Sequence, residues 1–294
     1  VVVGVAVMVC FWGNLSALSR RWLSIQVVVI VVVLGGIASW GDVLLGRWEN
    51  GLYTDRIIHT EDSPYQKIVL TQWHNDIRLF LDGHLQFASV DEHRYHESLV
   101  HPAMSLAAHK GRVLIVGGGD GLTAREVLKY RQVEKVDLVD LDAAVTRLGK
   151  RHVQLTRLNK NSLSNQKLTV HNEDAFQYIQ RPQEPYNIII VDLPDPREEA
   201  LSKLYSVEGY RLFRRHLAPG GVLVTQASSP YFAPQTFWSI AATLEAADMA
   251  VVSYHLNVPS FGEWGFHLAS IDSIKLDGIR FTVPRRYLRE EIFG

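Results

Sequence analysis

The chain has 294 residues, with 30 Lys and Arg against 31 Asp and Glu, so its formal net charge is −1 at pH 7. This balance excludes the strongly basic composition of proteins that bind nucleic acid through an extended charged surface, and we expect no nucleic-acid partner. The single cysteine, Cys10, excludes an internal disulfide framework and a cysteine-based metal finger.

Two apolar runs come first in the chain. No charged residue occurs from Val1 to Ser19, and after Arg20 and Arg21 none occurs from Trp22 to Gly41. A run of about 20 uncharged residues is long enough to cross a bilayer core as a helix. Valine-rich runs are also typical of buried strands or core helices. We expect residues 1–47 to be an apolar, transmembrane or membrane-associated segment.

A small β-domain is expected over residues 48–90. Apolar and polar residues alternate from about residue 65 to residue 87, and turn signals such as Asp82-Gly83 divide this stretch into strands of a β-meander. Asp91 then begins a stretch with the apolar spacing of a helix, which we expect to continue to residue 108.

From Arg112 onward, short apolar strands alternate with helical stretches. This alternation predicts a Rossmann-like, methyltransferase-type α/β domain over residues 91–294, with a parallel sheet covered by helices and a C-terminal tail. The expected strands are residues 113–116, 136–139, 167–170, 187–191, 222–225, 251–255 and an antiparallel 265–270. The expected helices are residues 122–130, a helix after Asp142, and residues 206–217 and 235–247.

The first of these strands runs into a glycine-rich loop, Gly117-Gly118-Gly119-Asp120-Gly121. Glycines allow a tight turn and the close approach of a ligand, and ligands of open parallel sheets bind at the carboxyl ends of the strands. A carboxylate in this loop would repel the pyrophosphate of a dinucleotide and favour a cationic cofactor. The loop therefore predicts a binding site for a positively charged ligand.

Acidic residues follow the next three strands. Asp140 lies about twenty residues after the glycines, where an acid typically binds ribose hydroxyls, whereas Asp142 suits a helix N-cap. Asp174 follows the third strand, and Asp192 and Asp195 follow the fourth on a loop that contains prolines. Such a ring of acids favours a cationic ligand, because repulsion between unpaired carboxylates raises their pKa values.

This series of motifs resembles the polyamine aminopropyltransferase (spermidine synthase) family. The resemblance covers about residues 63–270, and the preceding apolar runs resemble the membrane-anchored, multi-pass branch of that family. The segments that carry it are Tyr65-Gln66, Leu81-Asp82-Gly83, residues 91–97 (DEHRYHE), residues 117–121 (GGGDG), Asp140-Leu141-Asp142, Asp174 and residues 192–196 (DLPDP).

The resemblance implies transfer of the aminopropyl group of decarboxylated S-adenosylmethionine to a small amine such as putrescine, giving spermidine and methylthioadenosine. It implies no tightly bound cofactor and no metal. In this interpretation Asp192 is the general base, while Tyr95 and Asp195 position the amine. Gln66 and Asp120 bind the aminopropyl end of the co-substrate. The remaining co-substrate positions are Asp140 for the ribose, Asp174 and Ala175 for the adenine, and His96, Gly117 and Gly119.

Three of the predicted site residues depart from the usual pattern of the family, as does Leu193-Pro194 in the motif after the fourth strand. Ser228 stands where a glutamate often grips the far end of the diamine, Phe261 lies near the place of a tyrosine with the same purpose, and His96 replaces a common glutamine. We expect Ser228 and Phe261 to contact the amine, although the part of the site that anchors the amine differs more than the part that transfers the group.

Two other functions remain open from the sequence. The same sheet would serve an S-adenosylmethionine-dependent methyltransferase, and the altered amine site would suit a non-catalytic polyamine-sensing domain of a membrane protein. The family resemblance suggests a homodimer. Arg20 and Arg21 would place the following residues outside the cell by the positive-inside rule. Because the co-substrate is cytosolic, we instead expect the cell (inner) membrane, with the catalytic domain in the cytoplasm.

Overall fold

The computed structural model describes residues 16, 21–37, 53–195, 199–277 and 279–292. The chain divides into two units, Val1–Ile57 and Ile58–Gly294. In the first unit, residues 21–37 form a helix on which apolar side chains are exposed, for example 66% of Val32. None of the helices in the described ranges combines the length and the hydropathy that crossing a bilayer requires. The predicted transmembrane segment is therefore not found among these residues.

Two predictions about the N-terminal part lie outside the described residues. These are the first apolar run, apart from Ser16, and the domain boundary between residues 47 and 48. The second boundary, between residues 90 and 91, separates two parts of the unit Ile58–Gly294, and the division into domains stays a prediction.

A four-stranded sheet, with strand order β1-β2-β3-β4, corresponds to the predicted β-meander. β2 pairs with β3, and β3 with β4, in antiparallel register. Its apolar face packs on α5, through residues that include Ala144, Val145 and Leu148. The strands are β1 (Arg56–Asp62), β2 (Lys67–Trp73), β3 (Asp76–Leu81) and β4 (His84–Ala88), and the helix is α5 (Ala143–Arg151).

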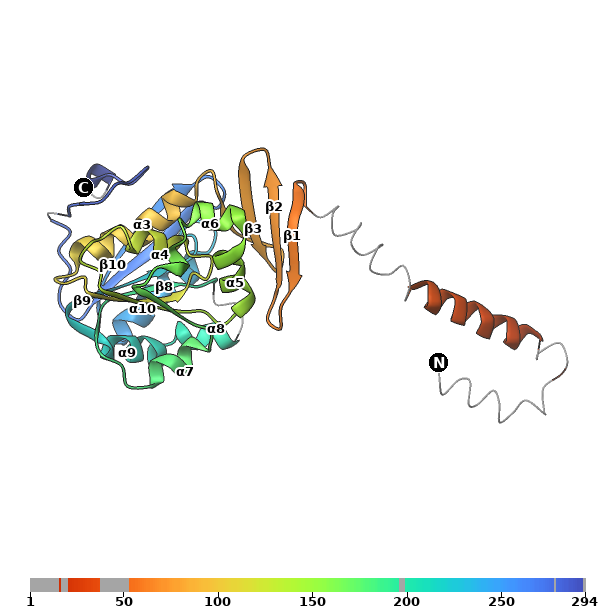
Figure 1. The fold of residues 1–294 in the computed structure, drawn as a ribbon. Coiled ribbons are helices and arrows are strands. Elements are labelled where there is room, and N and C mark those ends of the chain that lie inside the picture. The colour runs from red at the N-terminus through yellow and green to blue at the C-terminus, as the bar shows by residue number, and fades with distance from the viewer. Residues whose placement is uncertain (1–15, 17–20, 38–52, 196–198, 278, 293–294) are drawn as a thin grey trace. The chain divides into compact units, whose positions relative to one another are not determined.

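The second sheet has seven strands in the order β10-β11-β9-β8-β5-β6-β7, with helices on both of its faces (Figure 1). Its strands are β5 (Arg112–Gly117), β6 (Lys135–Val139), β7 (Leu168–His171), β8 (Tyr186–Asp192), β9 (Leu217–Gln226), β10 (Ala250–Val258) and β11 (Gly262–Ser270). The other helices are α3 (Glu92–Leu106), α4 (Leu122–Val127), α6 (Val153–Leu158), α7 (Ala175–Gln180), α8 (Glu199–Leu204), α9 (Val207–Arg215) and α10 (Pro234–Ala246), with 3-10 turns η2 (Ser162–Ser164) and η3 (Glu290–Ile292).

The central strands are apolar on both faces because both faces are covered. Along β5, Val113 and Ile115 belong to the core that includes residues of α3 and α4, whereas Leu114 and Val116 belong to the core that includes residues of α9 and α10. β5 pairs in parallel with β6 on one side and β8 on the other. The strand order therefore reverses at β5, which places a crevice at its carboxyl end.

The predicted α/β fold is confirmed, and the differences lie at the ends of its elements. α4 ends at Val127 rather than at residue 130. The segment from residue 218 to residue 221, between the predicted helix and the predicted strand 222–225, is the first part of β9, because Leu217 pairs with Tyr186 before a register shift in the ladder. β11 is antiparallel to both of its neighbours, as predicted for residues 265–270.

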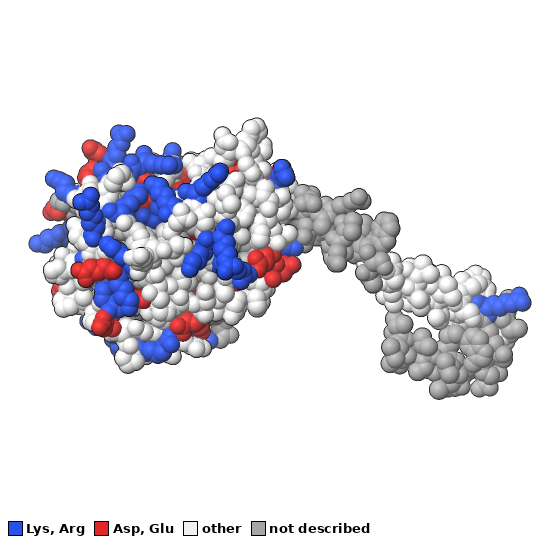
Figure 2. Space-filling model, in the orientation of Figure 1, with Lys and Arg blue, Asp and Glu red and all other residues white. Residues whose placement is uncertain are grey.

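The near-zero net charge of the chain does not mean that basic and acidic side chains are equally exposed. Lys and Arg side chains are more widely spread than Asp and Glu over the face in Figure 2. Several acidic residues are instead buried, with 4% exposure or less: Asp76, Asp91, Glu92, Glu97, Glu126, Asp137 and Asp142. The absence of a nucleic-acid partner, inferred from net charge, stays a prediction.

Glu97 connects α3 to the C-terminal tail. Its carboxylate is buried, with 1% exposure, and accepts backbone N–H bonds from Arg286, Tyr287 and Leu288 at 2.6, 2.8 and 2.9 Å. A buried carboxylate with three such donors is well compensated for its loss of hydration.

We expect Glu97→Ala to lower the free energy of unfolding by about 2–4 kcal/mol, because three backbone donors lose their acceptor. Urea denaturation followed by circular dichroism measures this change. Glu245→Ala, on the exposed side of α10, is the control and should change stability by less than about 0.5 kcal/mol. Equal stability of the two variants would show that Glu97 does not hold the tail.

Candidate active site

The glycine-rich loop brings the carboxylates of neighbouring strands close to its backbone. Gly117 has φ +82°, and a Cβ there would lie 2.1 Å from the carbonyl oxygen of Asp192. A Cβ on Gly119 would lie 2.5 Å from Oδ2 of Asp140, which accepts the Gly119 N–H at 3.0 Å. Both positions therefore require glycine, as the sequence predicts.

Asp192 ends β8, directly beside Gly117 in the sheet. Its Oδ1 accepts a hydrogen bond from the Tyr95 hydroxyl at 2.8 Å, and its Oδ2 accepts one from the Thr123 hydroxyl at 2.6 Å. Each oxygen keeps a second lone pair for a further donor. The carboxylate is thus held by α3 and α4 while it can still accept a proton. Sequence reasoning missed Thr123, whose signal is its place in the first turn after the glycines.

Tyr95 links Asp192 to the predicted amine contact Phe261. Burial first, and then the charge of Asp192, raise the pKa of the Tyr95 hydroxyl well above 10, so it stays a donor at neutral pH. The Tyr95 ring lies 6.3 Å from the ring of Phe261 and 5.4 Å from that of Phe266, measured between centroids. Tyr95, Asp192 and Phe261 therefore belong to one continuous cluster, and their predicted contacts with the amine stay a prediction.

Asp195 is held by two residues near the end of β9. Ser228 donates its hydroxyl to Oδ2 at 3.0 Å, and Gln226 donates Nε2 to Oδ1 at 3.3 Å. Gln226 also donates to the carbonyl of Leu193 and accepts the N–H of Ser228, whose φ of +61° turns the chain at this point. Ser228 therefore orients a carboxylate, a role the sequence did not suggest, and Gln226 was missed.

His96 forms a buried ion pair with Glu92. The imidazole Nδ1 lies 2.9 Å from the Glu92 carboxylate, which Arg125 also contacts at 2.8 Å through both terminal nitrogens. Burial opposes the charge on His96, but its hydrogen bond to Glu92 and the nearby carboxylates, among them Asp120, raise its pKa to about 9. Burial likewise opposes the charge on Glu92, yet His96 and Arg125 lower its pKa to about 2. His96 is therefore a cation at neutral pH.

Two half-buried acids of the site have raised pKa values. Burial, and then the charge of Asp192, raise the pKa of Asp120 to about 6 against the opposing effect of His96. Burial, together with Asp142 and Asp120, raises the pKa of Asp140 to about 6, although the N–H groups of Asp142 and Gly119 act in the opposite direction. A cationic ligand would relieve this repulsion.

The remaining predicted residues lie at the ends of other strands. Asp142 caps α5 by accepting the N–H of Ala144, as predicted, and its second oxygen accepts Nε2 of Gln66 at 3.0 Å. Asp174 is exposed and caps α7 through the N–H of Phe176, while Ala175 is buried. Within the described residues, no cluster of three or more His, Cys, Asp or Glu is arranged to hold a metal ion.

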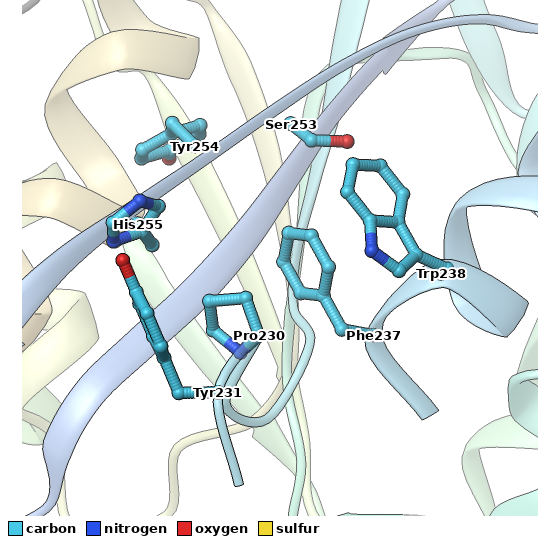
Figure 3. Close-up of a pocket in the computed structure, with 7 residues that line it drawn as sticks. All are labelled: Pro230, Tyr231, Phe237, Trp238, Ser253, Tyr254 and His255. Carbon is cyan, nitrogen blue, oxygen red and sulfur yellow. The ribbon is translucent and has the colours of Figure 1, made fainter. Parts of the chain in front are cut away.

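A hollow of about 240 Å³ is lined by residues other than these carboxylates (Figure 3). It is lined by residues of the loop after β9, of α10 and of β10, among them Tyr231, Trp238 and His255. None of the predicted site residues lines it. The candidate active site is therefore the carboxylate cluster at the end of β5 and β8.

The geometry of this cluster agrees with a match to a known family. Residues 92–276 match the family model described as the spermine/spermidine synthase domain. The chain belongs to this family. It is 46% identical to the polyamine aminopropyltransferase of Oceanobacillus iheyensis over 287 residues, which cover 94% of this chain and 56% of that protein. It is also 46% identical to polyamine aminopropyltransferase 1 of Streptomyces coelicolor over 295 residues, which cover 98% and 55%.

A solved structure of the family has the same fold. A crystal structure of spermidine synthase in complex with the transition state analogue AdoDATO superposes with a TM-score of 0.73 at 25% identity, covering 81% of this chain and 83% of that one. The chain spans about half the length of the curated relatives it matches. The predicted spermidine synthase family is confirmed.

The pKa of His96 makes stability depend on pH. Because folding raises this pKa from 6.5 to about 9, the His96–Glu92 pair stabilises the fold fully below pH 6.5, and this contribution is lost as pH rises through 9. Between these limits we expect the wild-type chain to lose about 3 kcal/mol more unfolding free energy than His96→Gln. Urea denaturation at several pH values tests this, with the exposed His109→Gln as control. Parallel curves for wild type and His96→Gln would contradict it.

Proposed function

We propose that the chain transfers the aminopropyl group of decarboxylated S-adenosylmethionine to a small amine such as putrescine, giving spermidine and methylthioadenosine. The observation that carries this proposal is the position of Asp192. Its carboxylate ends β8 beside the glycine-rich loop, held by Tyr95 and Thr123 and accessible to a further donor. The names of the relatives and of the structural neighbour support the same class of reaction.

The reaction needs a base because its nucleophile is an amine. An alkylamine with a lysine-like pKa of about 10.4 is mostly protonated at neutral pH, and taking its neutral form costs about 4–5 kcal/mol. A carboxylate within hydrogen-bond reach accepts the proton as the amine approaches. In this proposal Asp192 accepts that proton, and Asp195, oriented by Ser228 and Gln226, positions the amine.

The bond changes balance without a metal or a redox partner. The amine nitrogen forms a bond to the terminal carbon of the aminopropyl group while the bond from that carbon to the sulfonium sulfur breaks. The electron pair of the broken bond moves to sulfur, which becomes the neutral thioether of methylthioadenosine, and one amine proton goes to Asp192. Holding the amine in line with the carbon contributes several kcal/mol to the rate.

The electrostatics of the pocket suit two cationic substrates. Asp120 and Asp140 have pKa values of about 6 because they are partly buried near other carboxylates, and both are expected to ionise fully once a cation binds. We propose that Asp120, near His96, binds the aminopropyl end of the co-substrate together with Gln66, and that Asp140 binds the ribose. Asp174 and Ala175, which begin α7, would bind the adenine.

We expect purified protein to form methylthioadenosine from decarboxylated S-adenosylmethionine only when a di- or triamine is present. Asp192→Asn should lower kcat by about 10²–10⁴-fold, the usual contribution of a general base, and Thr123→Val should lower it less. Chromatography of methylthioadenosine measures both. Asp174→Asn, at the exposed N-cap of α7, should affect chiefly the KM of the co-substrate.

The same experiment separates the two alternative functions. Methylation of an added acceptor by S-adenosylmethionine would favour a methyltransferase. Binding of polyamine without any turnover would favour a sensing domain, and would refute the proposed transfer.

We also propose that the protein lies at the cell (inner) membrane with its catalytic domain in the cytoplasm, as a homodimer. The exposed apolar side chains of residues 21–37 support membrane association, because water does not favour such a surface. We expect the chain to sediment with the membrane fraction, and Val28→Asp with Val31→Asp to release part of it. A full chain that remains in the supernatant would refute the membrane proposal, and light scattering at the monomer mass would refute the dimer.

A further inference from the structure

A buried carboxylate before α3 is bound to a turn far away in the sequence. Asp91 is 4% exposed, and its two oxygens accept the N–H of Ser260 at 2.7 Å and the Ser260 hydroxyl at 2.8 Å. Asp91, where the sequence predicts a helix to begin, occupies the N-cap position of α3, yet its side chain makes no capping bond to the helix. The carboxylate therefore holds the turn between β10 and β11 and not the helix end.

The same turn presents an aromatic side chain to the candidate site. Phe261 follows Ser260, and its N–H closes the turn on the carbonyl of Val258 at 2.8 Å. The Phe261 ring packs between Tyr95, at 6.3 Å, and Trp264, at 5.2 Å between centroids. Arg94 of α3 adds a bond of 3.3 Å to the carbonyl of Asn257 at the end of β10.

Asp91, directly before α3, and Tyr95, in its first turn, are four residues apart, so both lie at the start of this helix. One helix turn therefore carries both the group that holds the β10–β11 turn and the hydroxyl that holds Asp192. Any shift of the turn relative to α3 would move Phe261 relative to Tyr95 and Asp192. Misplacement by about 1 Å is enough to impair a site of this kind.

We propose that Asp91 and Ser260 are positioning residues for the acceptor amine, and we call their contact the Asp91–Ser260 clamp. The clamp holds Phe261 against Tyr95, so that the two rings form the wall of the site next to Asp192. This inference rests on the proposed function, because it assigns the clamp to the amine and not to the co-substrate. Neither residue touches the reacting atoms.

The test combines steady-state kinetics with hydrogen–deuterium exchange on the full chain. Ser260→Ala removes the hydroxyl donor and keeps the backbone, Ser260→Thr restores the hydroxyl, and Asp91→Ala removes the acceptor. We expect Ser260→Ala to raise the KM for putrescine about tenfold, which corresponds to one charge-assisted hydrogen bond, with kcat and the KM for decarboxylated S-adenosylmethionine changed less than about twofold. Ser260→Thr should return the KM towards wild type. Ser239→Ala, on the exposed side of α10, is the matched control.

Hydrogen exchange decides whether the clamp exists independently of turnover. We expect faster exchange in residues 258–264 of Asp91→Ala and Ser260→Ala, with β5 and β8 unchanged. Unchanged exchange in this turn would overturn the proposal. So would a kcat loss without a change in the amine KM, or an equal rise of both KM values, which would indicate a general loss of structure. A wild-type chain without turnover would refute aminopropyl transfer, and the dissociation constant of putrescine, measured by calorimetry, would then replace its KM in the comparison.

Discussion

The partial burial of several carboxylates at the carboxyl ends of neighbouring parallel strands is the constraint on which the rest of the structure depends. Each of them is held by donors from its own chain. Tyr95 and Thr123 hold Asp192, the N–H groups of Gly119 and Asp142 hold Asp140, and Ser228 and Gln226 hold Asp195. A glycine-rich loop is needed at the centre because any side chain at Gly117 or Gly119 would collide with these strands. The carboxylates are thus ordered before any ligand binds, which lowers the cost of organising the site.

Helix α3 carries the contacts that connect this edge to the remainder of the unit. Its first turns use polar residues where an ordinary core helix uses apolar ones. Glu92 pairs with Arg125 of α4, Tyr95 with Asp192 of β8, and Glu97 with the tail. Buried charges contribute to a unique structure only when they are fully paired. The pairing of these residues therefore makes the position of α3, and with it the Tyr95 hydroxyl, depend on three separate parts of the fold.

The sequence predicted the sheet and the positions of its acids better than the contacts among them. β5 is a continuous apolar run because both of its faces are buried, and the glycines and Asp192 follow from strand ends. Local pattern gave no sign of Thr123 or Gln226, because each matters only through a partner brought near by the fold. β1 was missed because its seven residues are half-buried and rich in charge. For residues 21–37, the apolar run predicted a helix correctly, but the sequence does not show what contacts the apolar side chains of that helix.

The charge of the site argues for cationic substrates more strongly than the number of its acids does. The Glu92 carboxylate pairs with two cations, His96 and Arg125. His96 stays charged, and its positive charge also interacts with the carboxylates of Asp120 and Asp192. His96 is thus a cation of the protein itself within the cluster, and yet the pKa values of Asp120 and Asp140 are still raised to about 6. Burial is the largest cause of these raised pKa values and the charges of neighbouring carboxylates add to it, so the site has a deficit of positive charge that a cationic ligand would meet. A sulfonium and an ammonium, bound side by side, would meet that deficit, and their mutual repulsion would be screened by the carboxylates between which they lie. In the proposed reaction the methylthioadenosine that leaves would be neutral, so the transfer would remove one of the charges that held the substrates and would favour release of that product.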